Sequence, residues 1–251
     1  MRSTRRWTAA AALTTLTLFT AHVYGACAFG TSNEMSLQGV FDSVLVPGSL
    51  SAANDCIPSA ADGLWTAEGQ AAATIVIELS KYAGKNILGI YDPLNPQSQV
   101  SIFPGAASSG ATTTLELVSD GAGYDVMAND AVAGHFASSA FGFFIRTPRN
   151  RTFFSEPTLN TDQADHMYAY RGNGDLFTGG PLAGTLFATS MYLLAFENLR
   201  IPLGGPDFQD FVATVNFVAP IPLPAGAWLL GGLLASLALW HRRAVVASTS
   251  N

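Results

Sequence analysis

The stretch that decides the fold is Thr112–Val118, T-T-T-L-E-L-V, which is followed by S-D-G at residues 119–121. Threonine, leucine and valine suit a pleated strand, and the central L-E-L alternates apolar and polar side chains with the period of two typical of a half-buried strand. Aspartate and glycine then favour a tight turn. The stretch predicts one strand of an antiparallel sheet and a reversal of the chain after it.

Short segments of the same kind recur along the chain at a spacing of roughly ten residues, separated by glycine, proline, asparagine and aspartate. This spacing is typical of an antiparallel sandwich. We therefore expect a mainly β fold, an antiparallel and jelly-roll-like β-sandwich, over residues 29–218, which is long enough for one sizeable core. The predicted strands are Leu37–Val44, Thr74–Leu79, Asn86–Tyr91, Gln99–Phe103, Thr112–Val118, Phe141–Arg146, Met167–Arg171, Met191–Phe196 and Phe211–Val218.

Residues 1–28 have the organisation of a secretory signal peptide. Three arginines in the first six residues precede an uncharged apolar run over residues 7–21, and small residues follow it. This order is typical of the charged, apolar and cleavage regions of such a signal. We expect a signal helix that directs export, with cleavage either after Ala28 or after Gly25.

The cleavage position decides the chemistry of Cys27 and Cys56, the two cysteines of the chain. Cleavage after Gly25 keeps both, and in an oxidising exterior they can close a loop of about 30 residues, worth about 3–4 kcal/mol in the chain-entropy model. Cleavage after Ala28 leaves Cys56 alone. A lipoprotein with a lipid on Cys27 is a third alternative, but Tyr24 stands where a leucine belongs. The sequence favours the disulfide.

The C-terminal segment 219–243 begins with three alternating prolines and continues as an apolar run, Ala225–Trp240, that is closed by H-R-R. The prolines keep the first part extended and end the preceding domain. A helix over Ala225–Trp240 is about 24 Å long at about 1.5 Å per residue, and the apolar residues before it can extend it toward the ~30 Å of a bilayer core. We expect a single transmembrane helix, with the arginines and the polar tail 244–251 in the cytoplasm and the domain outside.

This order of prolines, apolar helix and arginines resembles the VPLPA variant of the PEP-CTERM sorting signal, over about a tenth of the chain. Proteins with this tail are processed near the proline motif by an exosortase, a membrane protease-transpeptidase. The resemblance implies a bacterial protein that is held transiently in the inner membrane and then passed to the cell surface or extracellular matrix. A plain membrane anchor is the alternative. The residues that carry the resemblance are Ile221, Pro222, Leu223, Pro224, Ala225, Arg242 and Arg243.

The segment between the two targeting signals is strongly acidic. It contains all 18 aspartates and glutamates of the chain against seven lysines and arginines, a net charge of −11. Such a surface repels nucleic acid and anionic lipid headgroups, and it attracts cations. The charge therefore argues against a nucleic-acid partner.

The second half of the chain carries a further resemblance. F-E-N at residues 196–198, a glycine-rich loop and D-F-Q-D at residues 207–210 precede the last predicted strand. This order resembles an uncharacterised bacterial ectodomain family marked by F-E-D and D-x-D-F-N-D, and the similarity covers Phe141–Val218. The activity of that family is not established, so the resemblance implies a kind of surface protein rather than a reaction.

The same loop is a candidate calcium site. Glu197, Asp207 and Asp210 flank the glycine-rich turn, Asn198 adds a carbonyl oxygen, and Asp165 can approach from a neighbouring strand. Calcium takes six to eight hard oxygens, which loop carboxylates and amides supply. The alternative is structural, because acids in such positions also cap turns and accept hydrogen bonds from backbone amides. The sequence leaves both interpretations open.

No recognisable catalytic motif occurs: the chain has no H-E-x-x-H, no G-x-S-x-G, no P-loop and no cysteine cluster. We therefore expect a non-catalytic protein with a structural or adhesive role, with extracellular polysaccharide as a candidate partner. The alternative is a secreted polysaccharide-active hydrolase or carbohydrate-binding module anchored by the same tail, since two carboxylates suffice for glycoside hydrolysis. Four aromatic residues could line a sugar cleft but suit a core equally well: Trp65, Tyr82, Tyr91 and Tyr124.

Overall fold

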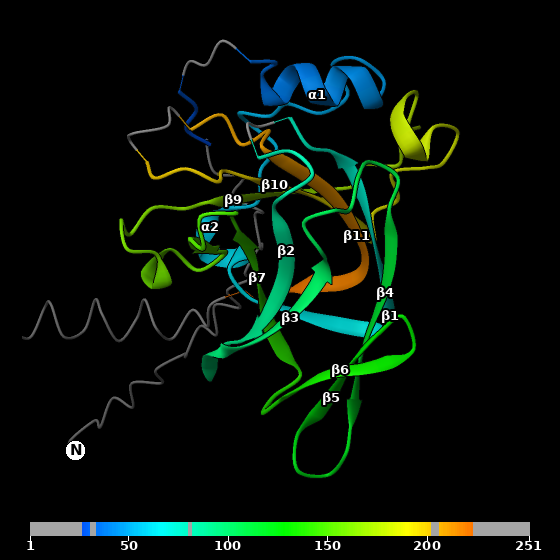
Figure 1. The fold of residues 1–251 in the computed structure, drawn as a ribbon. Helices are drawn as coiled ribbons and strands as arrows, with labels where there is room; N and C mark the ends of the chain where they lie inside the picture. Colours follow the sequence, from blue (N-terminus) through cyan, green and yellow to red (C-terminus); the bar gives the residue numbers. More distant parts are fainter. Residues whose placement is uncertain (1–26, 31–33, 80–81, 202–205, 223–251) are drawn as a thin grey trace, which may run out of the picture.

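The computed structural model describes residues 27–30, 34–79, 82–201 and 206–222 (Figure 1). In this part of the chain a curved antiparallel sheet carries short helices and long loops on one side. The strands are β1 (Trp65–Ile77), β2 (Ile87–Asp92), β3 (Asn95–Phe103), β4 (Thr112–Ser119), β5 (Tyr124–Ala128), β6 (Ala131–Phe136), β7 (Ala140–Arg146), β8 (Thr152–Phe154), β9 (Met167–Arg171), β10 (Met191–Phe196) and β11 (Phe211–Pro220). The helices are α1 (Leu37–Val44) and α2 (Ser59–Asp62), with single 3₁₀ turns at Pro157–Leu159 and Gly180–Leu182.

The strands pair in the order β3-β2-β7-β1-β11-β10-β9, and each of these pairings is antiparallel. A second branch, β4-β5-β6, leaves from β1 and returns toward β3, where the Ser98 hydroxyl donates a hydrogen bond to the carbonyl of His135 at 3.1 Å. The sheet is therefore nearly closed. The predicted mainly β, antiparallel architecture is confirmed.

Strand β1 holds the two sides of the molecule together. At its start Trp65 pairs with Phe141 of β7, and farther along the strand pairs with β4 and with β11. A register shift interrupts the pairing with β11 near Gly69, whose φ of +92° lies in the left-handed region that glycine tolerates. Because of this irregularity β1 can change direction and join the β2–β3–β7 side to the β9–β11 side (Figure 1).

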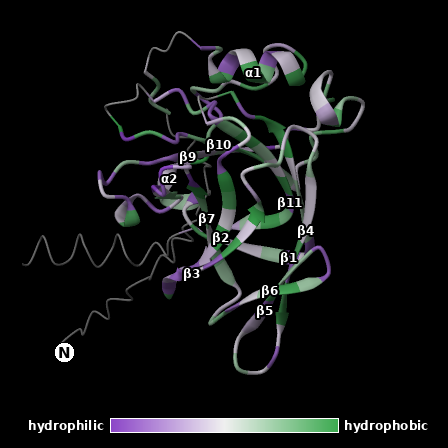
Figure 2. Cartoon of the chain, viewed as in Figure 1, coloured by the Kyte–Doolittle hydropathy of each residue, from purple (hydrophilic) through white to green (hydrophobic). Residues whose placement is uncertain are grey.

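The main core lies inside the curve of the sheet and is built on aromatic rings. Trp65 is completely buried and meets Phe143 and Tyr192 edge-on, with ring centroids 5.6 and 5.0 Å away. Figure 2 shows hydrophobic residues concentrated on the strands and hydrophilic residues mainly in the surrounding loops. Edge-to-face rings of this kind contribute energy beyond their buried area. Trp65 is therefore a core residue, as is the fully buried Tyr91.

Strand β10 is buried on both faces, which explains its uninterrupted apolar sequence. Leu194 and Phe196 belong to the main core, whereas Leu193 and Ala195 face a second core under α1. Successive side chains of a strand point to opposite faces, so a strand covered on both sides needs no polar residue. The acidic loop that follows β10 is consequently attached to a strand whose residues 193–196 are completely buried.

The prediction of a strand over Leu37–Val44 was wrong, because this segment is helix α1. Its apolar residues at positions 37, 40, 41 and 44 follow the helical spacing and cover the second core. The Ser36 hydroxyl also accepts a hydrogen bond from the amide of Gly39 at 3.1 Å, as a helix N-cap does. The N-cap and the helical spacing of the apolar residues favour a helix over the strand that the short apparent alternation had indicated.

The pair β5–β6 was not predicted as strands, although its turn has a recognisable sequence. Asn129 and Asp130 have φ values of 49° and 64°. Two consecutive left-handed residues make the tight turn that suits the twist of a two-stranded hairpin, and asparagine and aspartate are among the residues that tolerate it. Asn129 and Asp130 therefore form the hairpin turn between β5 and β6.

Most of the two predicted targeting segments lies outside the described residues. Residues 1–26 of the signal peptide and residues 223–251, including the predicted transmembrane run, are not described. Of the sorting motif, Ile221 and Pro222 are described, and the Ile221 amide donates to the carbonyl of Leu64 at 2.8 Å. Within the described ranges no helix has the length and apolar character needed to cross a membrane.

Candidate acidic site and disulfide

The acidic site lies where the last two strands leave their hairpin. Phe196, the last residue of β10, is paired with Phe211, the first residue of β11, so Glu197 and Asp210 face each other across the base of the loop. Both side chains are buried, with 1% and 5% of their surface exposed. The register of a rigid hairpin, rather than the loop itself, therefore brings these two carboxyl groups together.

The carboxylates of this loop accept hydrogen bonds from its backbone. Glu197 accepts from the amide of Leu199 through Oε1 at 2.9 Å and from the amide of Asp207 through Oε2 at 3.1 Å. Asp210 accepts from the amide of Asn198 through Oδ2 at 2.8 Å. Buried amides need such partners, so the acids fasten both ends of the loop.

A third carboxylate completes a group that could hold a metal ion. Glu197, Asp207 and Asp210 each offer one oxygen, and these oxygens lie within 4.8 Å of one another. The amide nitrogen of Gln209 donates to Asp207 at 2.9 Å and to Glu34 at 3.1 Å, while its own Oε1 is buried without a hydrogen-bond partner. An unsatisfied carbonyl oxygen beside converging carboxylates is a donor set that suits a hard cation.

The two buried carboxyl groups shift each other's proton affinity. Burial, followed by the neighbouring carboxylate of Asp210, raises the pKa of Glu197 to about 9. Burial also raises the pKa of Asp210 to about 6. Desolvation penalises a charged carboxylate, and a second negative charge adds to that penalty. Without a cation, Glu197 is therefore protonated at neutral pH.

This arrangement gives a prediction for metal-free protein. Because the folded pKa of Glu197 is above its ordinary value of 4.5, the folded state binds more protons than the unfolded state between about pH 4.5 and pH 9. Its contribution to the free energy of unfolding is full below this window and is lost as the pH rises through it. Urea unfolding in the presence of a chelator should show this decline, and Glu197→Gln should flatten it. Equal pH slopes for the two proteins would contradict the assignment.

Asp165 does not belong to this group, although the sequence placed it there as a candidate ligand. Its Oδ1 accepts from the amide of Met167 at 3.1 Å, and its carboxyl group lies beside Asp62 and the disulfide. The next residue, His166, does reach the acidic loop, because its Nδ1 lies 3.0 Å from the carbonyl oxygen of Glu197. His166 is buried, and its ring is stacked on that of Phe153. It therefore connects the residues before β9 to the end of β10 and has a structural role.

A second group of candidate ligands lies on the β4–β5–β6 side and was missed from the sequence. Asp125 and His135 face each other in the β5–β6 register, and His135 Nε2 lies 3.2 Å from an Asp120 oxygen. The three form the other group in the described residues that could hold a metal ion. Asp120 and His135 are exposed, and Asp120 already accepts from the amides of Ala122 and Gly123. The sequence could have indicated this group only through the register of the β5–β6 hairpin, and β6 was not predicted as a strand.

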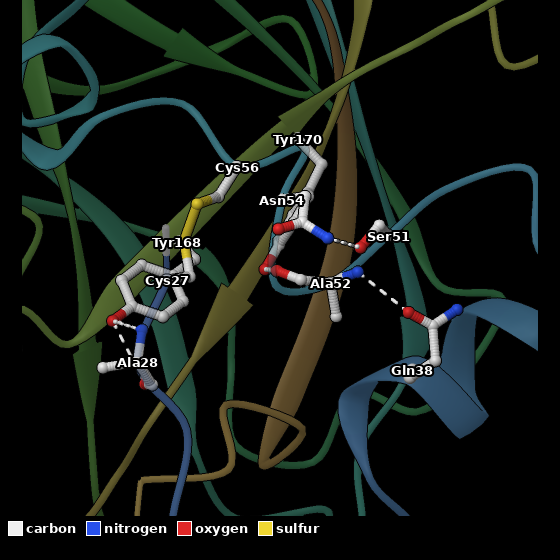
Figure 3. Close-up of a disulfide and its surroundings, with 9 residues drawn as sticks. All are labelled: Cys27, Ala28, Gln38, Ser51, Ala52, Asn54, Cys56, Tyr168 and Tyr170. Atoms are coloured by element: carbon white, nitrogen blue, oxygen red, sulfur yellow. Dashed lines mark hydrogen bonds between the residues drawn. A yellow bond between two sulfur atoms is a disulfide. The ribbon is translucent and has the colours of Figure 1, made fainter. Parts of the chain in front are cut away.

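The structure places Cys27 and Cys56 in a disulfide, with their Cα atoms 6.4 Å apart (Figure 3). The bond attaches the first described residues to the sheet, and hydrogen bonds continue the attachment. The Cys27 amide donates to the carbonyl of Ala53 at 3.0 Å, and the Ala28 amide donates to the Tyr168 hydroxyl at 3.2 Å. A disulfide at Cys27 requires a free thiol there, so it is incompatible with a lipid on the same sulfur.

Phe29, two residues after Cys27, also packs against the domain. The ring of Phe29 meets the rings of Tyr168 and Phe208 edge-on, with centroids 5.7 and 5.9 Å away. Residues 27–30 thus contact the folded domain through Cys27, Ala28 and Phe29. We call residues 27–30 the N-terminal strap.

Comparison with known proteins adds no relative: no family model, no curated protein and no solved structure matches the chain. The assignment of a function therefore depends on the geometry described above and on the targeting segments of the sequence.

Proposed function

We propose that this chain is an exported bacterial surface or extracellular-matrix protein, sorted by an exosortase-type protease, with a non-catalytic structural or adhesive role. The observation that carries the proposal is the disulfide between Cys27 and Cys56. Structural disulfides persist in oxidising compartments outside the cytoplasm. Cleavage of the signal after Gly25 retains Cys27 and the N-terminal strap, whereas cleavage after Ala28 removes the disulfide. The packed strap supports the first position.

In this proposal the C-terminal segment is a sorting signal and not only a membrane anchor. Strand β11 ends at Pro220, and the sorting motif starts directly after it. The domain is therefore separated from the predicted membrane segment by a few proline-rich residues, which stay extended. A jelly-roll-like sandwich held this way would place the motif close to the membrane, where an exosortase acts.

The contacts of the acidic residues support a role that is not catalytic. Glu197 and Asp210 bond to backbone amides of their own loop, and a general acid or nucleophile needs its oxygens free for a substrate. Of the four aromatic residues that could have lined a sugar cleft, Trp65 and Tyr91 are core residues, whereas Tyr82 and Tyr124 are partly exposed. The buried Glu197 and Asp210, with the half-buried Asp207, instead suit a structural cation that supports the region a matrix or a neighbouring cell would contact.

Calcium is the cation that we assign to the acidic loop. The three converging carboxylates and the unpartnered Oε1 of Gln209 are hard oxygen donors at the rim of a loop, which is the environment calcium prefers. A bound calcium would replace the proton of Glu197 and would hold Glu197, Asp207 and Asp210 together. Its chemistry there is structural, since it neutralises charge and fixes the surface that a partner would meet.

Sorting is tested by comparing wild type with two altered tails after cell fractionation. The variant Pro222→Ala/Pro224→Ala keeps the apolar run and the arginines. If the segment is a plain anchor, this variant should therefore be held in the membrane as wild type is. We expect wild type at the surface or in the matrix, and the proline variant retained and unprocessed in the inner-membrane fraction.

Deletion of residues 223–243 provides the matched control, because it leaves every described residue in place. This variant should be exported and released as a soluble domain. If the proline variant reaches the surface as wild type does, the segment is a membrane anchor and the sorting proposal is wrong.

A further inference from the structure

A hollow at the start of strand β10, at the opposite end of this strand from the acidic loop, is not used by the proposed function. It has a volume of about 560 Å³ and lies between the loop after α1 and the connection from β9 to β10. Its walls include Asp55 from the first of these segments, and Arg171 and Thr189 from the second. Sites for small ligands commonly have about 300–1,000 Å³ and a few placed polar groups, so this hollow has the size and the lining of such a site.

Arg171, the last residue of β9, brings a positive charge to the hollow that no described carboxylate neutralises. Its Nε donates to the carbonyl of Thr189 at 2.9 Å, which fixes the plane of the guanidinium group. The ion pairs among the described residues both involve histidines and not Arg171. A guanidinium group has five N–H donors in a fixed fork, and the four on its terminal nitrogens make no hydrogen bond to a described residue here. They are therefore available to a ligand.

Asp55 brings the opposite charge to the same hollow. Its Oδ2 accepts from the amide of Ser51 at 2.7 Å, and among the described residues no donor bonds to its Oδ1. Asp55 and Arg171 both line the hollow, yet they form no ion pair with each other. An ionised carboxylate only accepts hydrogen bonds, and a guanidinium group only donates them. The hollow therefore offers one free acceptor and several free donors to a molecule that enters it.

The loop that carries Asp55 is held in place without a ligand. The Tyr170 hydroxyl donates to the carbonyl of Ala52 at 2.8 Å, and the amide of Ala52 donates to the Gln38 side chain at 2.9 Å, as Figure 3 shows. Cys56, the residue directly after Asp55, is tied down by the disulfide. A site that is ordered in advance loses less entropy when it binds, so this loop is suited to recognition.

The charges around the hollow favour a neutral ligand that is rich in hydroxyl groups. The domain as a whole is strongly acidic and repels a polyanion, while Arg171 repels a cation at the hollow itself. A hydroxyl group both donates and accepts. Neighbouring hydroxyl groups of one ligand can therefore accept from Arg171 and donate to Asp55 without bringing any charge. Saccharides carry hydroxyl groups in this way on adjacent carbon atoms.

We propose that this hollow binds a neutral saccharide, with Arg171 donating to its oxygens and Asp55 accepting from its hydroxyl groups. The choice of extracellular polysaccharide as the source of the saccharide rests on the proposed function, whose adhesive role it makes specific. Thr189 precedes β10 and Glu197 follows it, so the hollow and the acidic loop lie at opposite ends of this strand. Saccharide binding therefore does not require the calcium assigned to the acidic loop.

Calorimetric titration of the purified full chain in a neutral detergent tests the site. The probes are neutral oligosaccharides of glucose, mannose, galactose and xylose, with an oligogalacturonate and free glycine as the acidic and zwitterionic comparisons. Arg171→Gln removes the positive charge, and Asp55→Asn removes the negative charge but keeps an oxygen for the Ser51 amide. Arg151→Gln is the matched control, because Arg151 is exposed, lies outside the hollow and bonds to no described residue through its side chain.

We expect a neutral oligosaccharide to bind with a dissociation constant of about 1 mM or lower. Arg171→Gln and Asp55→Asn should each weaken it at least about tenfold, because each loses a charge-assisted hydrogen bond. Arg151→Gln should bind as wild type does, and thermal unfolding should show all four proteins folded.

Three results would overturn the proposal: no binding of any neutral probe, equal binding by wild type and both hollow variants, or binding of the oligogalacturonate or glycine alone. None of these results bears on export, which cell fractionation measures separately. A protein that binds the saccharide through Arg171 and Asp55 but stays in the cytoplasm would contradict the proposed function and leave the binding site in place.

Discussion

Replacement of Cys27 and Cys56 by serine is expected to lower the free energy of unfolding by about 3–4 kcal/mol. The two residues are 29 positions apart, and the chain-entropy model gives a loss of this size when a loop of about 30 residues is no longer closed in the unfolded state. The folded state also changes, because the strap that carries Phe29 loses its covalent attachment. Chemical denaturation of the double variant and of wild type under oxidising conditions measures the difference.

Reduced wild type is the control for this experiment, since it has both sulfur atoms but no bond. It should resemble the double-serine variant in stability, and its strap should become accessible to proteases. Cys56 is buried, so a small additional loss from serine at that position is expected in the variant alone. Equal stability of the oxidised and reduced wild type would contradict the stabilisation assigned to the disulfide.

Calcium is expected to stabilise wild type by about 2.7 kcal/mol when its free concentration is 100 times its dissociation constant. The ion replaces the proton on Glu197, so its apparent affinity should rise with pH as the competition from protons weakens. Calorimetric titration gives the affinity, and thermal unfolding with calcium or chelator gives the stabilisation. Asp207→Asn should abolish most of both effects, because it removes one of the three converging charges but keeps an oxygen that can accept from Gln209.

The second group of candidate ligands provides the control for calcium binding. Asp125→Asn alters the exposed group that contains Asp120 and His135, and it leaves the acidic loop untouched. This variant should bind calcium as wild type does. Absence of heat and of any change in melting temperature for wild type would leave the carboxylates as purely structural caps of the hairpin. Loss of binding in Asp125→Asn alone would move the metal to the other side of the sheet.

The parts of the fold that could be predicted from the sequence are those in which residue type and periodicity agree. The apolar run of β10 and the alternating segment of β4 are both strands. In each, the order of apolar and polar side chains reflects which faces of the strand are buried. The convergence of Glu197 with Asp210 also followed from their places at facing strand ends. Helix α1 could not be separated from a strand in this way, since eight residues with Ser36 before them fit both periods in part.

The remaining features depend on contacts between residues distant in sequence. Asp165 lies just before β9, but its carboxyl group is close to Asp62, whose position at the end of a four-residue helix no local pattern indicates. The candidate metal ligands around His135 could be found only once the β5–β6 register was known. The contacts of the Gln209 amide likewise depend on the position of Glu34, which is distant in sequence. Sequence order gives the kinds of ligand available, whereas tertiary packing decides which of them meet.

The measurement that tests the account most directly is the intact mass and N-terminal sequence of the protein recovered from the outside of the cell. We predict a chain that begins at Ala26, retains Cys27 and carries no free thiol, because Cys27 and Cys56 are joined. A chain that begins at Phe29, or one that keeps its signal peptide and two reduced cysteines, would contradict export with the strap in place.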